Sequence, residues 1–422
     1  MAESAATEWF THSRFGLFLH WGLYSIPARA EWLKTIHKLR DEQYDVYFRE
    51  FNPTRYDPRA WAAMAKHAGM QYAVLTAKHH EGFCLFDSQH TTYTAMHAPA
   101  HRDLFRQYVE AFRAAGLKVG IYYSLLDWHH PEYTIDRHHP LRDLPPDDPE
   151  RTRRSLPKYV DYLHAQVREL LTNYGKIDLL WFDFSFDDKH SDAWRAAELV
   201  RMVRELQPGI LLNNRLTLGH ADTATQNNAL GDITTPEMAV PAQGIRDAAG
   251  RPVLWETCIT LNDHWGYTRD DHHFKTPAQV VRMLVECVSK GGNLLLNVGP
   301  TATGVIQAEA AAVLARVGEW MEANRESIYG AGPADMPLPD WGRYTRGEDG
   351  ALYAHVFQRP MGPIAFHGLA GKVQRARFLA DGSELVLNKP WNVPGDSPDL
   401  HVDLPGAPLI DDLDTVIALH PQ

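Results

Sequence analysis

Asp183 is an ionisable residue inside DLLWFDFSF, residues 178–186, a stretch that otherwise has the composition of a buried strand. Burying an unpaired charge is costly, so a carboxylate at this position needs a compensating partner or a function. Either Asp183 caps the segment that follows, or its side chain points into a site. The second interpretation predicts that other polar side chains converge on the same place.

Polar and aromatic side chains recur where the other strand-like runs end. They are His20 and Trp21, His79 and His80, Tyr123, Asp127 and Trp128, Trp181 beside Asp183, Asn213, Asn214 and Arg215, Glu237, and Glu256. In a (β/α)8 barrel, catalytic groups lie at the carboxyl ends of the strands and in the loops that follow them. The recurrence indicates one shared site rather than isolated buried polar residues.

Carboxylates in such a barrel site suggest glycoside hydrolysis, which needs one group to attack the sugar or activate water and another to protonate the leaving oxygen. Asp183 is the first candidate, and Glu31, Glu237 and Glu256 are candidates for the second. Each of these three has a plainer interpretation: a surface loop charge, a turn residue after a proline, and an orienting carboxylate within a strand. The residues alone leave this choice open.

Three His-His pairs, at 79–80, 129–130 and 272–273, raise the question of a zinc site. Adjacent residues of a strand point to opposite faces, so such a pair rarely binds one ion. The chain has no H-E-x-x-H or C-x-x-C motif, and GGNLLLNVGPTATG at 291–304 lacks the Lys-Ser/Thr of a phosphate-binding loop. The sequence therefore favours a reaction without a metal, and a metal-dependent barrel hydrolase is kept as an alternative.

Strands at eight places would position these residues: 15–22, 71–80, 118–128, 177–184, 209–215, 231–235, 253–258 and 293–300, with 231–235 the weakest. Their near-continuous apolar runs are typical of parallel strands buried on both faces. Helical faces at i, i+3, i+4 and i+7 lie between many of them, as at 104–112, 160–170, 199–206, 281–288 and 310–317. This alternation predicts an α/β fold, a (β/α)8 TIM-like barrel over residues 1–330. A doubly wound sheet is the alternative fold, disfavoured because no G-x-G-x-x-G follows a strand.

The pattern changes after YGAGPADMPLPDWG at 329–342, where glycines and prolines predict a linker over 331–340. Beyond it, apolar residues alternate at 352–356, 385–387 and 400–404, and ADGSE at 380–384 is a hairpin-turn signal. Residues 341–422 are therefore expected to form a small all-β sandwich domain.

The chain has 422 residues and a net charge of −11, which argues against nucleic acid or an anionic membrane as the partner. Its three cysteines are too few for a disulfide framework and are expected to be buried thiols. The first residues, MAESAATEWF, lack the features of a signal peptide, so a reducing cytoplasm is the expected compartment.

Six blocks of the sequence together resemble the α-L-fucosidases of glycoside hydrolase family 29: RFGLFLHWGLYS, EW, AKHHEGFCLFDS, LLWFD, WETC and KGGNLLLNVGPTATG, in order within residues 9–330. The resemblance implies a retaining, exo-acting hydrolysis of terminal α-L-fucose through a covalent glycosyl-enzyme. It also implies a barrel followed by a β-sandwich, and no metal or organic cofactor. The expected partner is a glycoside or oligosaccharide with a terminal fucose, and the resemblance admits a homo-oligomer because several relatives are oligomeric.

Residue roles follow from the same resemblance. Asp183 matches the nucleophile, and the substrate-binding positions match His20, Glu31, Trp32, His79, His80, Tyr123, Trp181, Arg215, Glu256 and Trp265. Tyr123 matches a tyrosine near the sugar and nucleophile, and Trp265 resembles an aromatic residue against the fucose methyl group. The acid/base of the family lies in a variable loop, which Glu237 in TTPEMAVP fits better than Glu256 in the regular W-E motif.

Phe184 departs from the pattern of the family, in which many members have glycine after the nucleophile. A phenylalanine there is expected to alter the rim of the pocket or the preference for leaving groups. Two alternative functions stay open: a related exo-glycosidase for a galactoside-like sugar, and a fucose-binding protein without catalysis. Linkage, aglycone, transglycosylation and assembly are not readable from the sequence.

Overall fold

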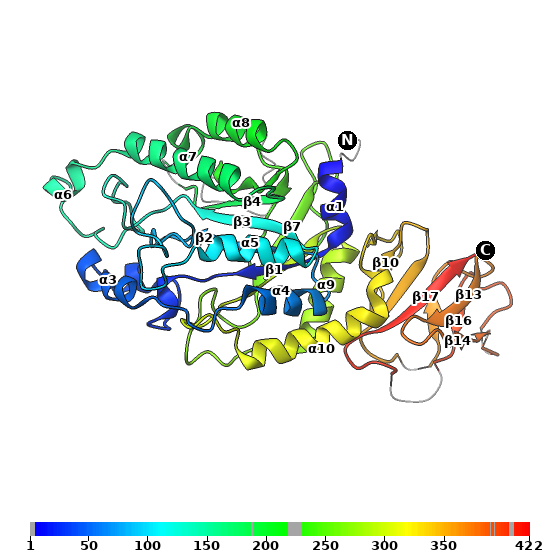
Figure 1. Cartoon of the computed structure of the whole chain (residues 1–422). Coiled ribbons are helices and arrows are strands. Elements are labelled where there is room, and N and C mark those ends of the chain that lie inside the picture. Colours follow the sequence, from blue (N-terminus) through cyan, green and yellow to red (C-terminus); the bar gives the residue numbers. More distant parts are fainter. Residues whose placement is uncertain are drawn as a thin grey trace.

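The computed structural model describes residues 5–422 except 187–188, 218–229, 361, 389, 392 and 405–408. Its larger part has parallel strands at the centre and helices around them (Figure 1). The strands are β1 Phe15–Leu19, β2 Tyr72–Lys78, β3 Lys118–Ser124, β4 Leu179–Asp183, β5 Leu211–Leu212, β6 Ile233–Thr234, β7 Leu254–Thr260 and β8 Asn293–Val298.

These strands lie in the order β5-β4-β3-β2-β1-β8-β7-β6, so each pairs with its neighbour in the chain. A parallel bridge between Asn213, just after β5, and Ile233 of β6 joins the two ends. The arrangement confirms the TIM-like barrel, and the doubly wound alternative is wrong. The weakest predicted strand, at 231–235, is present as the two residues of β6.

The helices are α1 Ala5–Ser13, α2 Leu33–Ile36, α3 Asp41–Glu50, α4 Pro58–His67, α5 Leu104–Ala114, α6 Pro149–Thr152, α7 Leu156–Asn173, α8 Ala196–Leu206, α9 Pro277–Ser289 and α10 Ala308–Asn324. Short 3-10 turns are η1 Leu23–Ser25, η2 Ser191–Trp194, η3 Asn214–Leu216 and η4 Arg325–Ser327. The predicted apolar faces fall on α5, α7, α8, α9 and α10. In α5, Leu104, Tyr108 and Phe112 are buried, and Asp103 caps its N-terminus by accepting a hydrogen bond from the Arg106 N–H at 2.8 Å.

Two apolar layers hold the barrel together. Phe18, Tyr122, Trp181, Cys258 and other inward-facing residues fill its interior, whereas outward-facing residues pack against the helices. Residues two apart on a strand share a face, so the longer strands contribute to both layers. Because of this alternation, only the inward-facing side chains of each strand can reach the interior of the barrel.

The C-terminal part consists of antiparallel sheets, as predicted. One sheet has the order β14-β13-β17-β11-β10-β9 and the other β12-β16-β15. Their bounds are β9 Gly332–Pro333, β10 Gly342–Arg346, β11 Leu352–Val356, β12 Ile364–Phe366, β13 Val373–Phe378, β14 Glu384–Leu385, β15 Leu387–Asn388, β16 Leu400–Val402 and β17 Thr415–Pro421. β9 lies inside the predicted linker, and the turn predicted at 380–384 joins β13 to β14.

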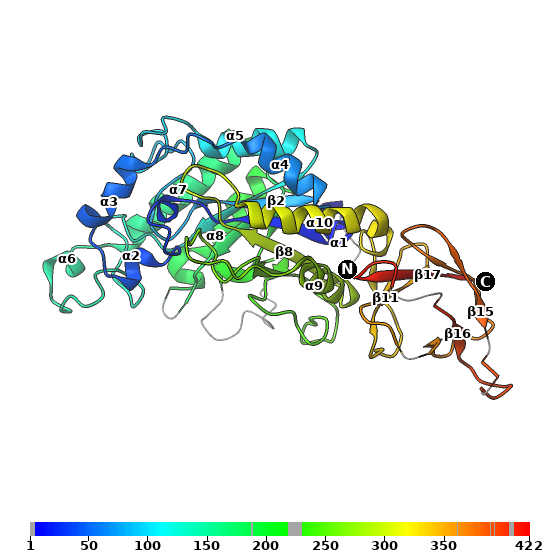
Figure 2. The same ribbon diagram turned by 90° about the horizontal axis from the view of Figure 1, so that it is seen from below.

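The two parts lie end to end, with α6 at one extreme of the molecule and the antiparallel strands at the other (Figures 1 and 2). α9 and α10 carry the contact between them. Arg282 of α9 donates to the Phe357 carbonyl at 2.8 Å, and Trp320 of α10 donates to the Asp414 carbonyl at 2.8 Å. None of the described helices has the length and apolarity to cross a membrane.

Candidate active site

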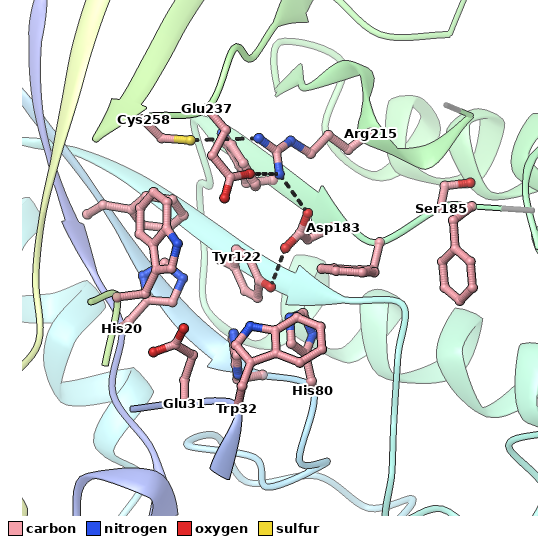
Figure 3. A pocket seen from close by; sticks show the side chains of 16 residues that line it. His20, Glu31, Trp32, His80, Tyr122, Asp183, Ser185, Arg215, Glu237 and Cys258 are labelled. Carbon is pink, nitrogen blue, oxygen red and sulfur yellow. Dashed lines mark hydrogen bonds and ion pairs between the residues drawn. The ribbon is translucent and has the colours of Figure 1, made fainter. Parts of the chain in front are cut away.

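A cavity of about 280 Å³ lies at the carboxyl ends of the barrel strands (Figure 3). Its walls come from the ends of β1, β3, β4 and β7, from the segments just after β2 and β5, and from loops. All of the predicted site residues except Tyr123 and Glu256 line it. The residues predicted at the strand ends therefore converge on a single cavity.

Asp183 is the last residue of β4, and both of its carboxylate oxygens have donors. Oδ2 accepts from the Tyr122 hydroxyl at 2.7 Å, and Oδ1 accepts from Arg215 Nη1 at 2.9 Å. Burial, with the Asp183 charge next in importance, raises the pKa of Tyr122 well above its ordinary value, so the phenol keeps its proton as a donor. The charge within the apolar strand is thus compensated.

Arg215 joins Asp183 to the second acid of the cavity. The same Nη1 that bonds Asp183 lies 2.7 Å from Glu237 Oε2. Nε donates to the Thr235 hydroxyl at 3.0 Å, and Nη2 donates to its carbonyl at 3.1 Å, so the guanidinium is fixed in place. Because one nitrogen bonds both carboxylates, the two acids are close neighbours. A short separation, about 5–5.5 Å, is what a retaining glycosidase requires.

Glu237 is held at the mouth of the cavity rather than at its floor. Its loop is pinned to β7, since the Met238 N–H donates to the Cys258 carbonyl at 2.9 Å and the Cys258 N–H donates to the Pro236 carbonyl at 3.1 Å. The Glu237 side chain is 39% exposed, against 12% for Asp183. The two acids therefore differ in exposure to solvent although they share a partner.

The three cavity histidines are buried and neutral. Burial lowers the pKa of His20 to about 3, and it lowers those of His79 and His80 well below the ordinary value. His20 Nδ1 is 2.7 Å from Asn297 Oδ1, and His80 Nδ1 is 2.7 Å from the Ser124 hydroxyl. His79 Nδ1 is buried without a hydrogen-bond partner among the described residues. Neutral imidazoles of this kind can donate to and accept from sugar hydroxyls.

Loop residues complete the wall on the side of His20. Glu31 Oε2 accepts from the Gly266 N–H at 2.8 Å, and burial raises the pKa of Glu31. Asn297 Nδ2 donates to the Trp265 carbonyl at 2.8 Å, so one side chain holds both His20 and Trp265. The Trp265 ring lies 5.0 Å from the His20 ring. This corner combines hydrogen-bonding groups with an apolar aromatic face, which suits a deoxy sugar.

The expectation for Tyr123 is wrong, and its neighbour Tyr122 occupies the position next to Asp183. In the register of β3 with β4, Tyr122 lies opposite Trp181 on the inward face. Tyr123 points to the helices instead, where its hydroxyl donates to Gln166 Oε1 of α7 at 2.8 Å. Tyr122 and Tyr123 have identical side chains, and they differ only in the face of the strand to which each one points.

Glu256 does not line the cavity, so the expectation that it contacts the substrate is also wrong. It is fully buried on β7, and its oxygens accept from Trp181 Nε1 at 2.9 Å and from the Tyr72 hydroxyl at 2.7 Å. The Trp181 ring in turn lies under the Arg215 guanidinium, 4.4 Å from it. Glu256 therefore supports the floor of the cavity from below.

The expectation that His79 and His80 point to opposite faces of a strand is wrong. β2 ends at Lys78, so both residues lie beyond the strand. Both side chains enter the cavity, with ring centroids 3.9 Å apart, instead of pointing to opposite faces. Within the described ranges, no group of three or more His, Cys, Asp or Glu side chains is placed to hold a metal ion.

The sequence analysis did not identify several lining residues: Phe18, Tyr122, Ser185, Phe186 and Cys258. Their inward position follows from strand alternation, since Phe18 lies two residues before His20 and Cys258 two after Glu256. Ser185 and Phe186 follow Asp183 in a loop, where alternation gives no guide. Phe184, which was singled out as unusual, is also part of the lining.

The known proteins that this chain resembles are alpha-L-fucosidases. Residues 1–326 match the family model described as alpha-L-fucosidase. The human plasma alpha-L-fucosidase is 27% identical over 388 residues, which is 85% of this chain and 78% of that protein.

Two solved structures extend the comparison. Alpha-L-fucosidase isoenzyme 1 from Paenibacillus thiaminolyticus is 53% identical, with a TM-score of 0.94 and 99% of each chain covered. A GH29 alpha-L-fucosidase from Bacteroides thetaiotaomicron is 30% identical, with a TM-score of 0.87 and coverage of 100% of this chain and 97% of that chain. That structure is of a covalent intermediate trapped from 2-fluoro-fucosyl fluoride in a glutamate-to-glutamine variant.

Proposed function

This chain belongs to the alpha-L-fucosidase family, glycoside hydrolase family 29, and on that premise we propose that Asp183 is its nucleophile and Glu237 its general acid/base. The reaction is the retaining hydrolysis of terminal α-L-fucose through a covalent glycosyl-enzyme. The observation that carries the two residue assignments is the Arg215 nitrogen bonded to both carboxylates.

In the first step, Asp183 attacks the anomeric carbon and the glycosidic bond breaks. Glu237 gives its proton to the departing oxygen, so the aglycone leaves as a neutral alcohol and the sugar becomes an ester of Asp183. The Tyr122 hydroxyl holds Asp183 Oδ2, which leaves the lone pairs on the other oxygen of the carboxylate to be shared between Arg215 and the sugar.

In the second step, water enters where the aglycone was and Glu237, now ionised, removes its proton. The hydroxide so formed attacks the same carbon, and Asp183 is released as a carboxylate. Glu237 suits both roles because it lies at the mouth of the cavity, where leaving group and water pass. Arg215 offers a cationic partner to whichever of the two acids is charged.

The neutral histidines and Glu31 bind the sugar hydroxyls in this scheme, and Trp265 packs against the apolar side of the ring. Since the histidine pKa values lie well below 6.5, these contacts keep the same protonation state from weakly acidic to alkaline pH.

Leaving-group dependence tests the two assignments separately. Asp183→Ala should lower kcat on every aryl fucoside by on the order of 10⁴-fold or more, and azide should restore part of the activity of Asp183→Gly. Glu237→Ala should lower kcat by roughly 10²–10⁴-fold on fucosides with poor leaving groups and far less on those with good ones.

Glu256→Ala is the matched control for Glu237, since it removes a carboxylate of the same barrel that does not reach the cavity. Its effect should be similar for good and poor leaving groups. If Glu256→Ala shows the steep leaving-group dependence and Glu237→Ala does not, the acid/base assignment is wrong.

Compartment and assembly stay predictions. All three cysteines are buried free thiols, which suits the expected reducing cytoplasm. A homo-oligomer is the expectation carried over from relatives, and sedimentation of the purified chain would measure it.

A further inference from the structure

Phe184 adopts a backbone conformation that a phenylalanine rarely takes. Its φ is +71°, in the left-handed region that favours glycine. Glycine would adopt this conformation without strain, yet the chain places a large aromatic side chain directly after Asp183. Strain of this kind at a site is a reason to ask what the side chain contributes there.

The Phe184 ring is the centre of an aromatic cluster. Its centroid lies 4.9 Å from His80, 5.3 Å from Trp32, 5.3 Å from His138 and 5.9 Å from Phe186. The His80, His138 and Phe186 rings meet it nearly edge to face, and the Trp32 ring is tilted; such offsets are favourable for aromatic pairs. We call Trp32, Phe184 and Phe186 the aromatic wall, because all three also line the cavity.

The far end of this wall is fixed by the loop after β4. Phe186 and Lys189 exchange backbone hydrogen bonds of 3.0 and 2.8 Å, and Lys189 Nζ forms an ion pair with Asp136 at 2.8 Å. Trp194 Nε1 donates to the Lys189 carbonyl at 2.7 Å. Phe186 is therefore held in place without any contact to a sugar.

Trp32 borders the sugar side of the cavity beside Glu31, and Phe184 and Phe186 continue the wall away from His80 (Figure 3). In Figure 3, His20 and Glu31 lie on one side of Asp183 and Ser185 lies on the other. The anomeric carbon must lie against the Asp183 carboxylate, and the ring hydroxyls lie with the histidines and Glu31. The leaving oxygen must lie within reach of Glu237, and Phe184, Ser185 and Phe186 line the same cavity away from the sugar-binding histidines, so an aglycone that extends past Glu237 can contact them.

We infer that the aromatic wall is a binding subsite for the aglycone, and that it selects aglycones with a flat apolar face. An aryl ring or the C–H face of a pyranose has that shape, and both stack on aromatic side chains. The inference rests on the proposed function and adds to it the class of leaving group that the enzyme prefers. It also gives the strained phenylalanine a role that glycine cannot fill.

The test compares leaving groups that can and cannot touch the wall. α-L-Fucosyl fluoride has no aglycone to stack, whereas an aryl fucoside and a fucosyl disaccharide do. For Phe184→Ala, kcat/KM should fall roughly tenfold more on the aryl fucoside and the disaccharide than on the fluoride. Phe184→Tyr, which keeps the ring, should restore most of the difference. An equal loss on all three substrates, or no loss on any, overturns the inference.

Two further measurements keep the outcome unambiguous. Phe184→Gly suits the backbone at φ +71°, so it provides a folded variant without the ring if the alanine variant does not fold. The 2-fluoro-fucosyl enzyme can be reactivated with aryl-substituted alcohols or with methanol, and Phe184→Gly should lose the advantage of the aryl acceptors. Failure of the proposed function would look different, since fucosyl fluoride itself would not be hydrolysed by the wild-type chain.

Discussion

Arg215 is the residue on which both acids of the site depend. A guanidinium presents several donors in a fixed plane, so it can bond Asp183, Glu237 and Thr235 at the same time. A lysine ammonium could bond both carboxylates, but it lacks the further nitrogens that anchor Arg215 to Thr235. The geometry of the two carboxylates is therefore a property of Arg215 as much as of the strand that carries Asp183 and the loop that carries Glu237.

Arg215→Lys should lower kcat on an aryl fucoside by roughly 10²-fold or more, because the donor shared by the two acids is no longer fixed by Thr235. The matched control is Arg204→Lys, at an arginine that pairs with Asp232 at 2.5 Å outside the cavity lining. Steady-state kinetics of both variants checks this. Wild-type kcat in Arg215→Lys would show that the anchoring of the guanidinium by Thr235 is not needed.

Phe184 gives a prediction about stability that is independent of catalysis. At φ +71° an alanine is strained and a glycine is not, so Phe184→Gly should be more stable than Phe184→Ala by about 1 kcal/mol. Phe186 has no positive φ, and there the order should reverse, with alanine the more stable by about 0.5–1 kcal/mol. Urea unfolding of the four variants measures both differences. The same order at both positions would mean that the backbone of Phe184 is not strained.

Among the elements, the strands were readable from sequence because a parallel barrel strand is a short apolar run ending in polar residues. What could not be read is which of two adjacent residues faces inward. Tyr122 and Tyr123 are identical, and only the register of β3 against β4 separates them. Ser185 and Phe186 could not be predicted for a different reason. They lie in a loop, and the spacing of residues in a loop does not tell which side chains face the cavity.

Glu256 shows how one strand residue ties several elements together inside the barrel. It sits on β7 and receives hydrogen bonds from Tyr72 of β2 and Trp181 of β4. Sequence reasoning saw a carboxylate in a regular motif and placed it among the groups that touch the sugar. Its depth in the barrel, two residues below Cys258 of the lining, could be known only from the fold.

Burial raises the pKa of Glu256 from its usual 4.5 to about 7, and this gives the stability a pH dependence of known sign. Between these values the folded protein keeps a proton that the unfolded chain has released. The contribution of Glu256 to the free energy of unfolding therefore falls as pH rises from 4.5 to 7, by on the order of 3 kcal/mol.

Glu256→Gln lacks this titration, so its stability relative to wild type should improve as pH rises from 4.5 to above 7. Urea unfolding of both proteins at pH 5 and pH 7.5 measures the change. The other titrating groups, such as His20, whose low pKa acts in the opposite direction, are present in both proteins and cancel in the difference. A difference that does not vary with pH would show that Glu256 does not titrate in this range.

For the molecule as a whole, the contact between the barrel and the C-terminal sheets combines ion pairs, such as that of Arg316 with Asp411, with buried hydrogen bonds. The Trp320 indole of α10 is fully buried and donates to the Asp414 carbonyl. The Asp414 side chain in turn pairs with His355 of β11 at 2.6 Å, with both side chains inaccessible to solvent. The two parts are therefore expected to unfold together in a single thermal transition.

Trp320→Phe tests this coupling by removing one donor and little volume. The buried Asp414 carbonyl would lose its partner, at a cost of about 1–3 kcal/mol, and Tm should fall by a few degrees as one transition.

Asp412→Asn is the control from the same contact, because Asp412 is 88% exposed in its pairing with Arg316 and such pairs contribute little. Activity on an aryl fucoside should stay at the wild-type level in both variants, since neither residue lines the cavity. A calorimetric trace that splits into two transitions in Trp320→Phe would show instead that barrel and sheets unfold independently.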